Sequence, residues 1–137
     1  MSLIRITAGP HRFVARLEED DAPRTCAAIR AMLPFRSKLV HARWSGEACW
    51  VPMGERRLGI DFENHTSHPA PGEILIYPGG ISEMEILVPY GATSFASKVG
   101  PLAGNHFATV VEGAEALREL GRLVLWEGAQ DLRIEEA

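Results

Sequence analysis

The stretch Pro71–Gly91, PGEILIYPGGISEMEILVPYG, decides the fold. It holds two apolar runs, Glu73–Tyr77 and Glu83–Val88, on either side of a turn that contains Gly79-Gly80. Short apolar and β-branched runs that flank a glycine turn are typical of a β-hairpin. The stretch therefore predicts two neighbouring antiparallel strands.

The same alternation continues outward from this hairpin in both directions. Strands are expected at 4–7, 11–17, 39–44, 48–51, 58–62, 106–111 and 132–135, with a short one in the loop 92–104. Alternating apolar residues place one face of such a strand toward a core. The polar stretch Glu63–Pro71, ENHTSHPAP, is expected to be a loop.

Two segments have helical spacing instead. The first has Asp20 or Asp21 as a cap and Pro23 in its first turn, and ends at Pro34. The second runs from Glu112 to about Trp126, weakened by a glycine in its interior. Helices and strands do not alternate, which disfavours a doubly wound parallel sheet. The pattern favours a mainly β protein, with a closed antiparallel barrel of about eight strands whose open ends are plugged by two helices.

The length and composition of the chain exclude several classes of function. With 137 residues the chain suffices for one domain, 1–137, and needs no disulfide or metal to fold. A net charge of -4 with little clustering of Lys and Arg argues against binding to nucleic acid or to anionic membranes. Leader and spanning patterns are absent from the sequence, so we expect a cytoplasmic protein. Cys26 and Cys49 have no metal-binding or redox spacing, and no phosphate-loop motif appears, so no cofactor is expected.

Three segments resemble known proteins. They are GEACW (46–50), VGPLAGNHFATVVEG (99–113) and the positions Gly72, Glu73, Tyr77, Pro78, Gly79 and Gly80. Together they resemble the cyclophilin-like barrel of a bacterial family of unknown function. The resemblance implies a barrel with its pocket on the outer face. The Phe-His-Arg and Gln-Gly-Gly elements of true cyclophilins are not legible, so strong prolyl isomerase activity is not expected.

Two acidic and two histidine positions stand out as candidate site residues. His65 and His68 are three apart in the polar loop and could bind a metal, but two ligands alone favour a polar loop or ligand contact. Glu83 and Glu85 fall on one strand face. One interpretation is a carboxylate pair that acts in acid–base catalysis or binds a cationic ligand. The other, which is favoured, is that both side chains belong to a solvent-facing exterior of the barrel.

A second set of candidates comes from neighbouring strands. His41 and Arg43 share a face of the strand 39–44, where Arg43 could hold a carboxylate or form only a surface ion pair. Trp44 and Trp50 are expected in the core. His106, at the start of a strand, suits a ligand role and a structural role equally well.

Two functions remain open at this stage, and whether the protein is an enzyme is undecided because no catalytic residue is identified. The first is a small-molecule-binding protein, a metabolic enzyme being one form of it, with a cleft on the outer face of the barrel. Its ligand is expected to be small and partly anionic, and its binding residues to be Arg43, His65, His68, Tyr77, Glu83 and His106. The alternative is a module that binds peptides or proteins. The apolar, glycine-rich segment 99–107 further suggests a homo-oligomer.

Overall fold

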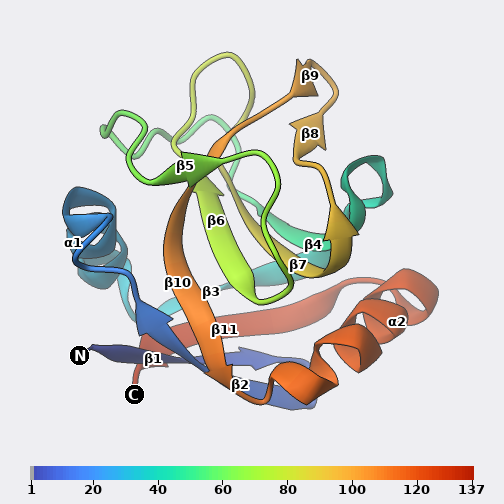
Figure 1. Cartoon of the computed structure of the whole chain (residues 1–137). Coiled ribbons are helices and arrows are strands. Elements are labelled where there is room, and N and C mark those ends of the chain that lie inside the picture. The colour runs from blue at the N-terminus through green and yellow to red at the C-terminus, as the bar shows by residue number, and fades with distance from the viewer. Residues whose placement is uncertain (1) are drawn as a thin grey trace.

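Eight antiparallel strands close into a barrel in the computed structural model, which describes residues 2–137 (Figure 1). Three further strands have two residues each: β5 (His65–Thr66), β8 (Ala96–Ser97) and β9 (Gly100–Pro101). The barrel strands are β1 (Leu3–Ala8), β2 (His11–Leu17), β3 (Phe35–His41), β4 (Gly46–Pro52), β6 (Glu73–Tyr77), β7 (Glu85–Thr93), β10 (Gly104–Glu112) and β11 (Gln130–Glu136).

Hydrogen bonding orders these strands β2-β1-β11-β3-β4-β7-β6-β10, and pairing of β10 with β2 closes the circle. β5 pairs with the start of β10, whereas β8 and β9 form a separate small hairpin. Figure 1 shows this hairpin standing beyond the end of the barrel, above β4 and β7. The predicted mainly β barrel with two helices is therefore confirmed.

The stretch that decided the fold forms β6 and β7, in the register Leu75↔Leu87 and Tyr77↔Glu85. The second strand begins at Glu85, not at Glu83. Residues 78–84 between the strands form a loop, in which Gly79 has a φ of 94°. This conformation is readily available only to glycine.

Alternation along these strands separates two cores. Ile76, Ile86 and Phe107 belong to the main core inside the barrel. Leu75 and Leu87, one residue out of phase, point to the outside of the wall. There they pack with Ala42, Ala48, Tyr77, Phe95 and Leu102 in a second, smaller cluster. The segment 94–103 thus covers part of the barrel's outer face.

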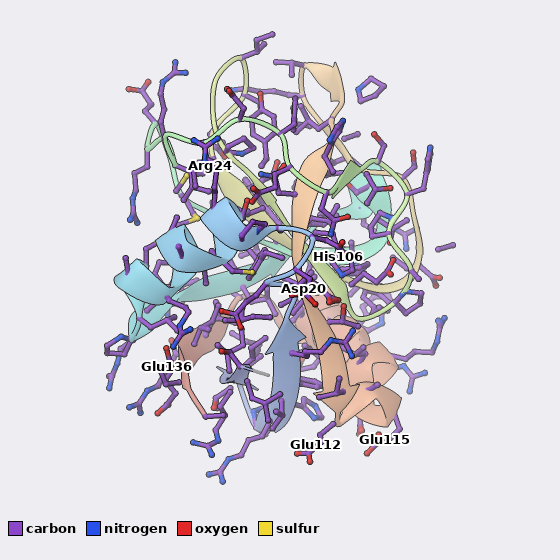
Figure 2. All side chains as sticks on the ribbon, turned by 60° about the vertical axis from the view of Figure 1, so that its left-hand side comes forward. Asp20, Arg24, His106, Glu112, Glu115 and Glu136 are labelled. Carbon is purple, nitrogen blue, oxygen red and sulfur yellow. The ribbon has the colours of Figure 1, made fainter. Side chains whose placement is uncertain are left out.

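The helices are α1 (Pro23–Met32) and α2 (Leu117–Glu127), the latter preceded by a 3-10 turn at Ala114–Ala116. Figure 2, turned toward α1, shows Asp20 ahead of the helix and Arg24 in its first turn. The prediction that Asp20 or Asp21 caps α1 is wrong, because Ala22 occupies the cap position. In the described residues no helix has the length and apolar character needed to cross a bilayer.

Several predicted bounds also differ from the structure. The strand expected at 39–44 ends at His41 and gives way to a 3-10 turn at Arg43–Ser45. The alternating residues at 58–62 form no strand, because this segment finds no neighbouring strand to pair with. The glycine-rich segment 99–107 is not one long loop, since its second half opens β10.

Candidate functional site

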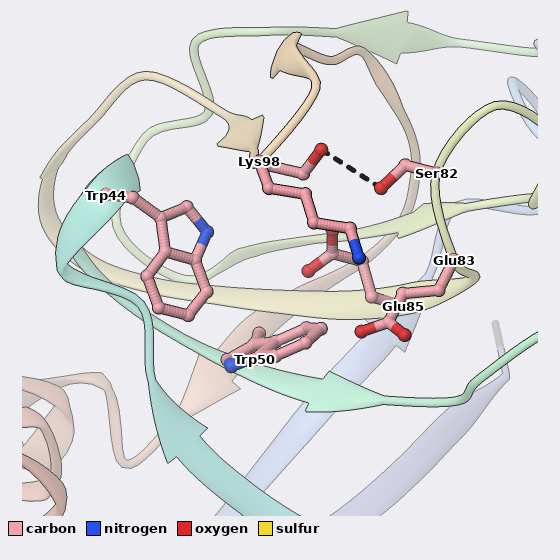
Figure 3. A pocket seen from close by; sticks show the side chains of 7 residues that line it. Trp44, Trp50, Ser82, Glu83, Glu85 and Lys98 are labelled. Carbon is pink, nitrogen blue, oxygen red and sulfur yellow. Dashed lines mark hydrogen bonds between the residues drawn. The ribbon is translucent and has the colours of Figure 1, made fainter.

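A pocket of about 340 Å³ lies on the outer face of the barrel (Figure 3). Its lining is mainly apolar and includes two tryptophans and two glutamates. The lining residues are Trp44, Trp50, Ser82, Glu83, Glu85, Ser97 and Lys98. Three of them, Ser82, Glu83 and Glu85, come from the stretch that decided the fold.

Strand parity explains how this pocket is assembled. Trp50 on β4 lies opposite Leu87 on β7, and Leu87 belongs to the outer cluster. Glu85 is two residues before Leu87 and therefore projects from the same face. The 3-10 turn at Arg43–Ser45 brings Trp44 above this face.

Hydrogen bonds fix the hairpin that forms the opposite wall. The Ser45 hydroxyl donates to the carbonyl oxygen of Ala96 at 3.1 Å, and the Ala96 N–H donates to the same hydroxyl oxygen. The Ser82 hydroxyl donates to the Ser97 hydroxyl oxygen at 3.0 Å, the bond drawn as a dashed line in Figure 3. The loop before β7 and the β8–β9 hairpin are therefore held together beside the pocket.

The two tryptophans form one wall. Their ring centroids are 5.5 Å apart and their planes are nearly perpendicular, at 82°. Trp44 is 52% exposed, so the expectation of a core residue is wrong for it. Trp50 is half-buried against the outer cluster, and its Nε1 is buried with no hydrogen-bond partner among the described residues.

Glu85 is the most unusual group in the pocket. Its side chain is 1% exposed, and its Oε2 finds no partner within the described part of the chain. Burial, reinforced by the nearby charge of Glu83, raises the pKa of Glu85 to about 8. The favoured interpretation of a solvent-facing pair is therefore wrong for Glu85, whereas Glu83 is exposed. The pocket therefore contains a carboxyl group whose protonated form is favoured by burial, with one oxygen that has no partner among residues 2–137.

A second pocket of about 460 Å³ adjoins the first. The two share Ser82, Glu83 and Lys98 in their linings, so they are neighbours on the same face of the protein. The second pocket is mainly polar, and its other lining residues are Glu55, Arg56, Arg57, Gly80 and Ile81. The combined surface runs from an aromatic wall to a charged one.

The sequence-predicted site residues do not all meet here. Glu83 lines both pockets, and Tyr77 is buried on β6 directly opposite Glu85. Arg43 is exposed in the 3-10 turn beside Trp44, not on a strand face with His41. The pKa of His41 is lowered, mainly because the side chain is partly buried and to a smaller extent because the positive charge of Arg43 is nearby.

The three histidines belong to a different part of the barrel. His65 pairs with Asn105 of β10 and stacks on Phe62, at 4.8 Å between ring centroids. His106 lies on β10 (Figure 2), and its Nε2 is 2.8 Å from the Thr109 hydroxyl oxygen. His68 lies in the exposed loop after β5. Residues 2–137 hold no group of three His, Cys, Asp or Glu side chains placed to bind a metal ion.

The sequence reasoning missed the pairing of Trp44 and Trp50 with Glu85. One signal was available, since Glu85 shares its strand face with Leu87 and its neighbours Met84 and Ile86 are also apolar. A carboxylate with apolar neighbours on both faces of a strand indicates burial. No comparable pattern in the sequence indicated that Arg56 and Arg57 line the second pocket.

Comparisons with known proteins support the fold. The family described as "Protein of unknown function (DUF3830)" matches residues 4–136. No curated protein matches the chain. The structure of McbB in complex with tryptophan is similar with a TM-score of 0.74 and 22% identity, covering 96% of this chain and 44% of McbB. The solution structure of the hypothetical protein AF2241 from Archaeoglobus fulgidus has a TM-score of 0.64 and 19% identity, covering 99% of this chain and 95% of that one.

These similarities concern the fold. The chain spans less than half the length of McbB, so the rest of that protein has no counterpart here. AF2241 is covered over 95% of its length, so the similarity in fold extends over nearly the whole of both chains.

Proposed function

The chain belongs to the DUF3830 family of proteins of unknown function, and we propose that it binds a small organic amine with an apolar body in the outer-face pocket. One observation carries the proposal. Glu85 is buried in an apolar wall with one carboxyl oxygen that has no partner among the described residues. Buried polar atoms in proteins are nearly always hydrogen-bonded, so an unpartnered carboxyl oxygen on a residue that lines a pocket fits a missing ligand group.

An ammonium group satisfies this site better than a neutral donor. A positive charge beside Glu85 favours ionisation of the carboxyl group and so opposes the effect of burial on its pKa. The exposed carboxylate of Glu83 adds a second negative charge at the same pocket. The faces of Trp44 and Trp50 can attract a cation further, by about 0.5–2 kcal/mol.

The size of the pocket limits the apolar body. A volume of about 340 Å³ is near the lower end of the range for small-molecule sites. It suits a single ring system with a short chain. The structural neighbour McbB was solved with tryptophan, which carries an aromatic ring and an amine, and this chemistry is consistent with the proposal.

The residue set differs from the one expected from sequence. Glu83 and Tyr77 remain near the pocket, while Arg43 and the histidines are replaced by Trp44, Trp50 and Glu85. A compact pocket with a buried acid favours a small molecule over a peptide. A homo-oligomeric, cytoplasmic protein remains a prediction.

Tryptophan fluorescence provides the test, because Trp44 and Trp50 line the pocket and phenyl ligands do not absorb at the excitation wavelength. The probes are phenethylamine and the neutral alcohol of similar size, 2-phenylethanol. Hydrogen bonds to charged groups contribute roughly 1.5–3 kcal/mol, so we expect the amine to bind about 10- to 150-fold more tightly.

Two variants identify the residue responsible. Glu85→Gln should abolish the preference for the amine, and the exposed control Glu115→Gln should keep it. Circular dichroism checks that each variant is folded, and Trp44→Ala, at an exposed position, offers a second perturbation of the pocket. Equal binding of amine and alcohol, or a preference that survives in Glu85→Gln, would overturn the proposal.

A further inference from the structure

Resting on the proposed amine site, we infer that the ligand is an amino carboxylate whose acidic group binds in the adjoining pocket at Arg56 and Arg57. The amine would lie near Glu85, and the apolar group would lie against Trp44 and Trp50. The inference follows from how the two pockets meet, from their charges and from how the second pocket is held in place.

The two pockets meet at a pair of opposite charges. Glu83 and Lys98 line both pockets, together with Ser82. Figure 3 shows the Lys98 side chain reaching from the β8–β9 hairpin toward the side of the pocket that carries the glutamates. A ligand with one charge would face an unfavourable partner at this junction. A zwitterion can place its amine toward the glutamates and its carboxylate toward the cations.

The lining of the second pocket contains more positive than negative side chains. Its positive groups are Arg56, Arg57 and Lys98, against Glu55 and Glu83. None of the three cations forms an ion pair with a carboxylate anywhere in residues 2–137. A guanidinium group matches the two oxygens of a carboxylate with parallel hydrogen bonds. The unpaired arginines are therefore suited to the acidic group of a ligand.

Backbone hydrogen bonds hold the arginine loop against the Pro78–Gly80 turn. The Leu58 N–H donates to the Pro78 carbonyl oxygen at 2.9 Å. On the other side of the arginines, the Met84 N–H donates to the Gly54 carbonyl oxygen at 3.1 Å. The loop that carries the two arginines is thus fixed at both ends.

The absence of a side chain at Gly79 allows the arginine loop to lie close to this turn. A Cβ on Gly79 would lie 2.8 Å from the carbonyl oxygen of Arg56, too close for ordinary contact. A side chain at Gly79 would therefore push the arginine loop away from the pocket. This gives the Pro-Gly-Gly element of the sequence a role in shaping an anion site as well as a turn.

Three ligands separate the contributions of the two charges. Phenethylamine carries the amine, 3-phenylpropanoate carries the acid, and phenylalanine carries both. Calorimetric titration of the wild type should show phenylalanine binding at least tenfold more tightly than either of the others. The double variant R56A/R57A should remove that advantage while leaving phenethylamine binding intact.

The control is R12A/R122A, which removes the same charge from exposed positions on β2 and α2. It should keep the preference for phenylalanine. If phenethylamine binds and phenylalanine binds no better, the zwitterion inference is overturned while the amine site stands. A preference for phenylalanine that persists in R56A/R57A also overturns it. If neither compound binds, the amine site fails and the inference fails with it.

Discussion

Glu63 accepts two hydrogen bonds from Thr25, one from its backbone N–H and one from its hydroxyl, each at 2.7 Å. Thr25 lies in the first turn of α1, whereas Glu63 lies in the loop before β5. The buried amide of Asn105 joins them, accepting from the Glu63 N–H at 3.0 Å and donating to the Thr25 hydroxyl oxygen at 3.1 Å. A residue distant in sequence therefore caps α1 and ties the loop to β10.

Removal of this cap should destabilise the fold. Glu63→Ala leaves the Thr25 N–H without its acceptor, so we expect the free energy of unfolding to fall by about 1–2 kcal/mol, as for other helix caps. Urea denaturation followed by circular dichroism measures it. Asp20→Ala and Asp21→Ala are the matched controls, because neither residue caps the helix, and each should stay within about 0.5 kcal/mol of wild type. A loss in the controls equal to that in Glu63→Ala would contradict the assignment.

The buried carboxyl group of Glu85 should make stability depend on pH. Its pKa is about 8 in the folded protein, against an ordinary value of 4.5. Below pH 4.5 both folded and unfolded chains hold the proton. Between pH 4.5 and 8 only the unfolded chain releases it, so stability falls as pH rises and levels off above 8. The full effect is on the order of 5 kcal/mol.

The Glu85→Gln variant isolates this contribution, because an amide does not titrate in this range. Its stability relative to wild type should increase from pH 5 to pH 8 in thermal denaturation. Glu115→Gln, at an exposed position, should follow the wild-type profile. Parallel profiles for wild type and Glu85→Gln would show that Glu85 does not titrate near pH 8.

Gly121 should resist replacement despite lying inside a helix. A Cβ at this position would come within 2.4 Å of the Tyr90 ring, which packs beneath α2. Alanine improves helix propensity by about 1 kcal/mol, but overpacking costs typically 1–3 kcal/mol. We therefore expect Gly121→Ala to destabilise the protein in urea denaturation. Arg122→Ala, exposed on the same helix, should be near neutral, and a stabilised Gly121→Ala would show that Tyr90 moves freely.

The contacts of His106 determine its tautomer. The Thr109 hydroxyl donates its single proton to Glu18 at 2.8 Å, so it can only accept from the ring Nε2 of His106. Neutral His106 should therefore carry its proton on Nε2, which ¹⁵N NMR of the ring detects. Thr109→Val removes the acceptor and should give a mixture of tautomers. A proton on Nδ1 in the wild type would contradict the network.

The sequence alone predicted the barrel, because the alternation of apolar residues and the glycine turns are local properties of each strand. The hairpin of β6 (Glu73–Tyr77) and β7 (Glu85–Thr93) could be predicted because its two strands are neighbours in the sequence and pair with each other. The same local pattern failed at 58–62, where the segment has apolar residues at strand spacing but no strand to pair with. Periodicity predicts which face a residue would present and does not establish that a partner strand is available.

The candidate site was decided by tertiary structure. Strand parity correctly separated Glu85 from Met84 and Ile86, yet it could not tell whether the face of Glu85 meets solvent. That depends on the segment 94–103 and on the turn that carries Trp44, which cover the outer face from other parts of the chain. Burial raises the pKa of Glu85 only once this cover is in place, because desolvation is a property of everything packed around a group, not of the residue and its neighbours in sequence.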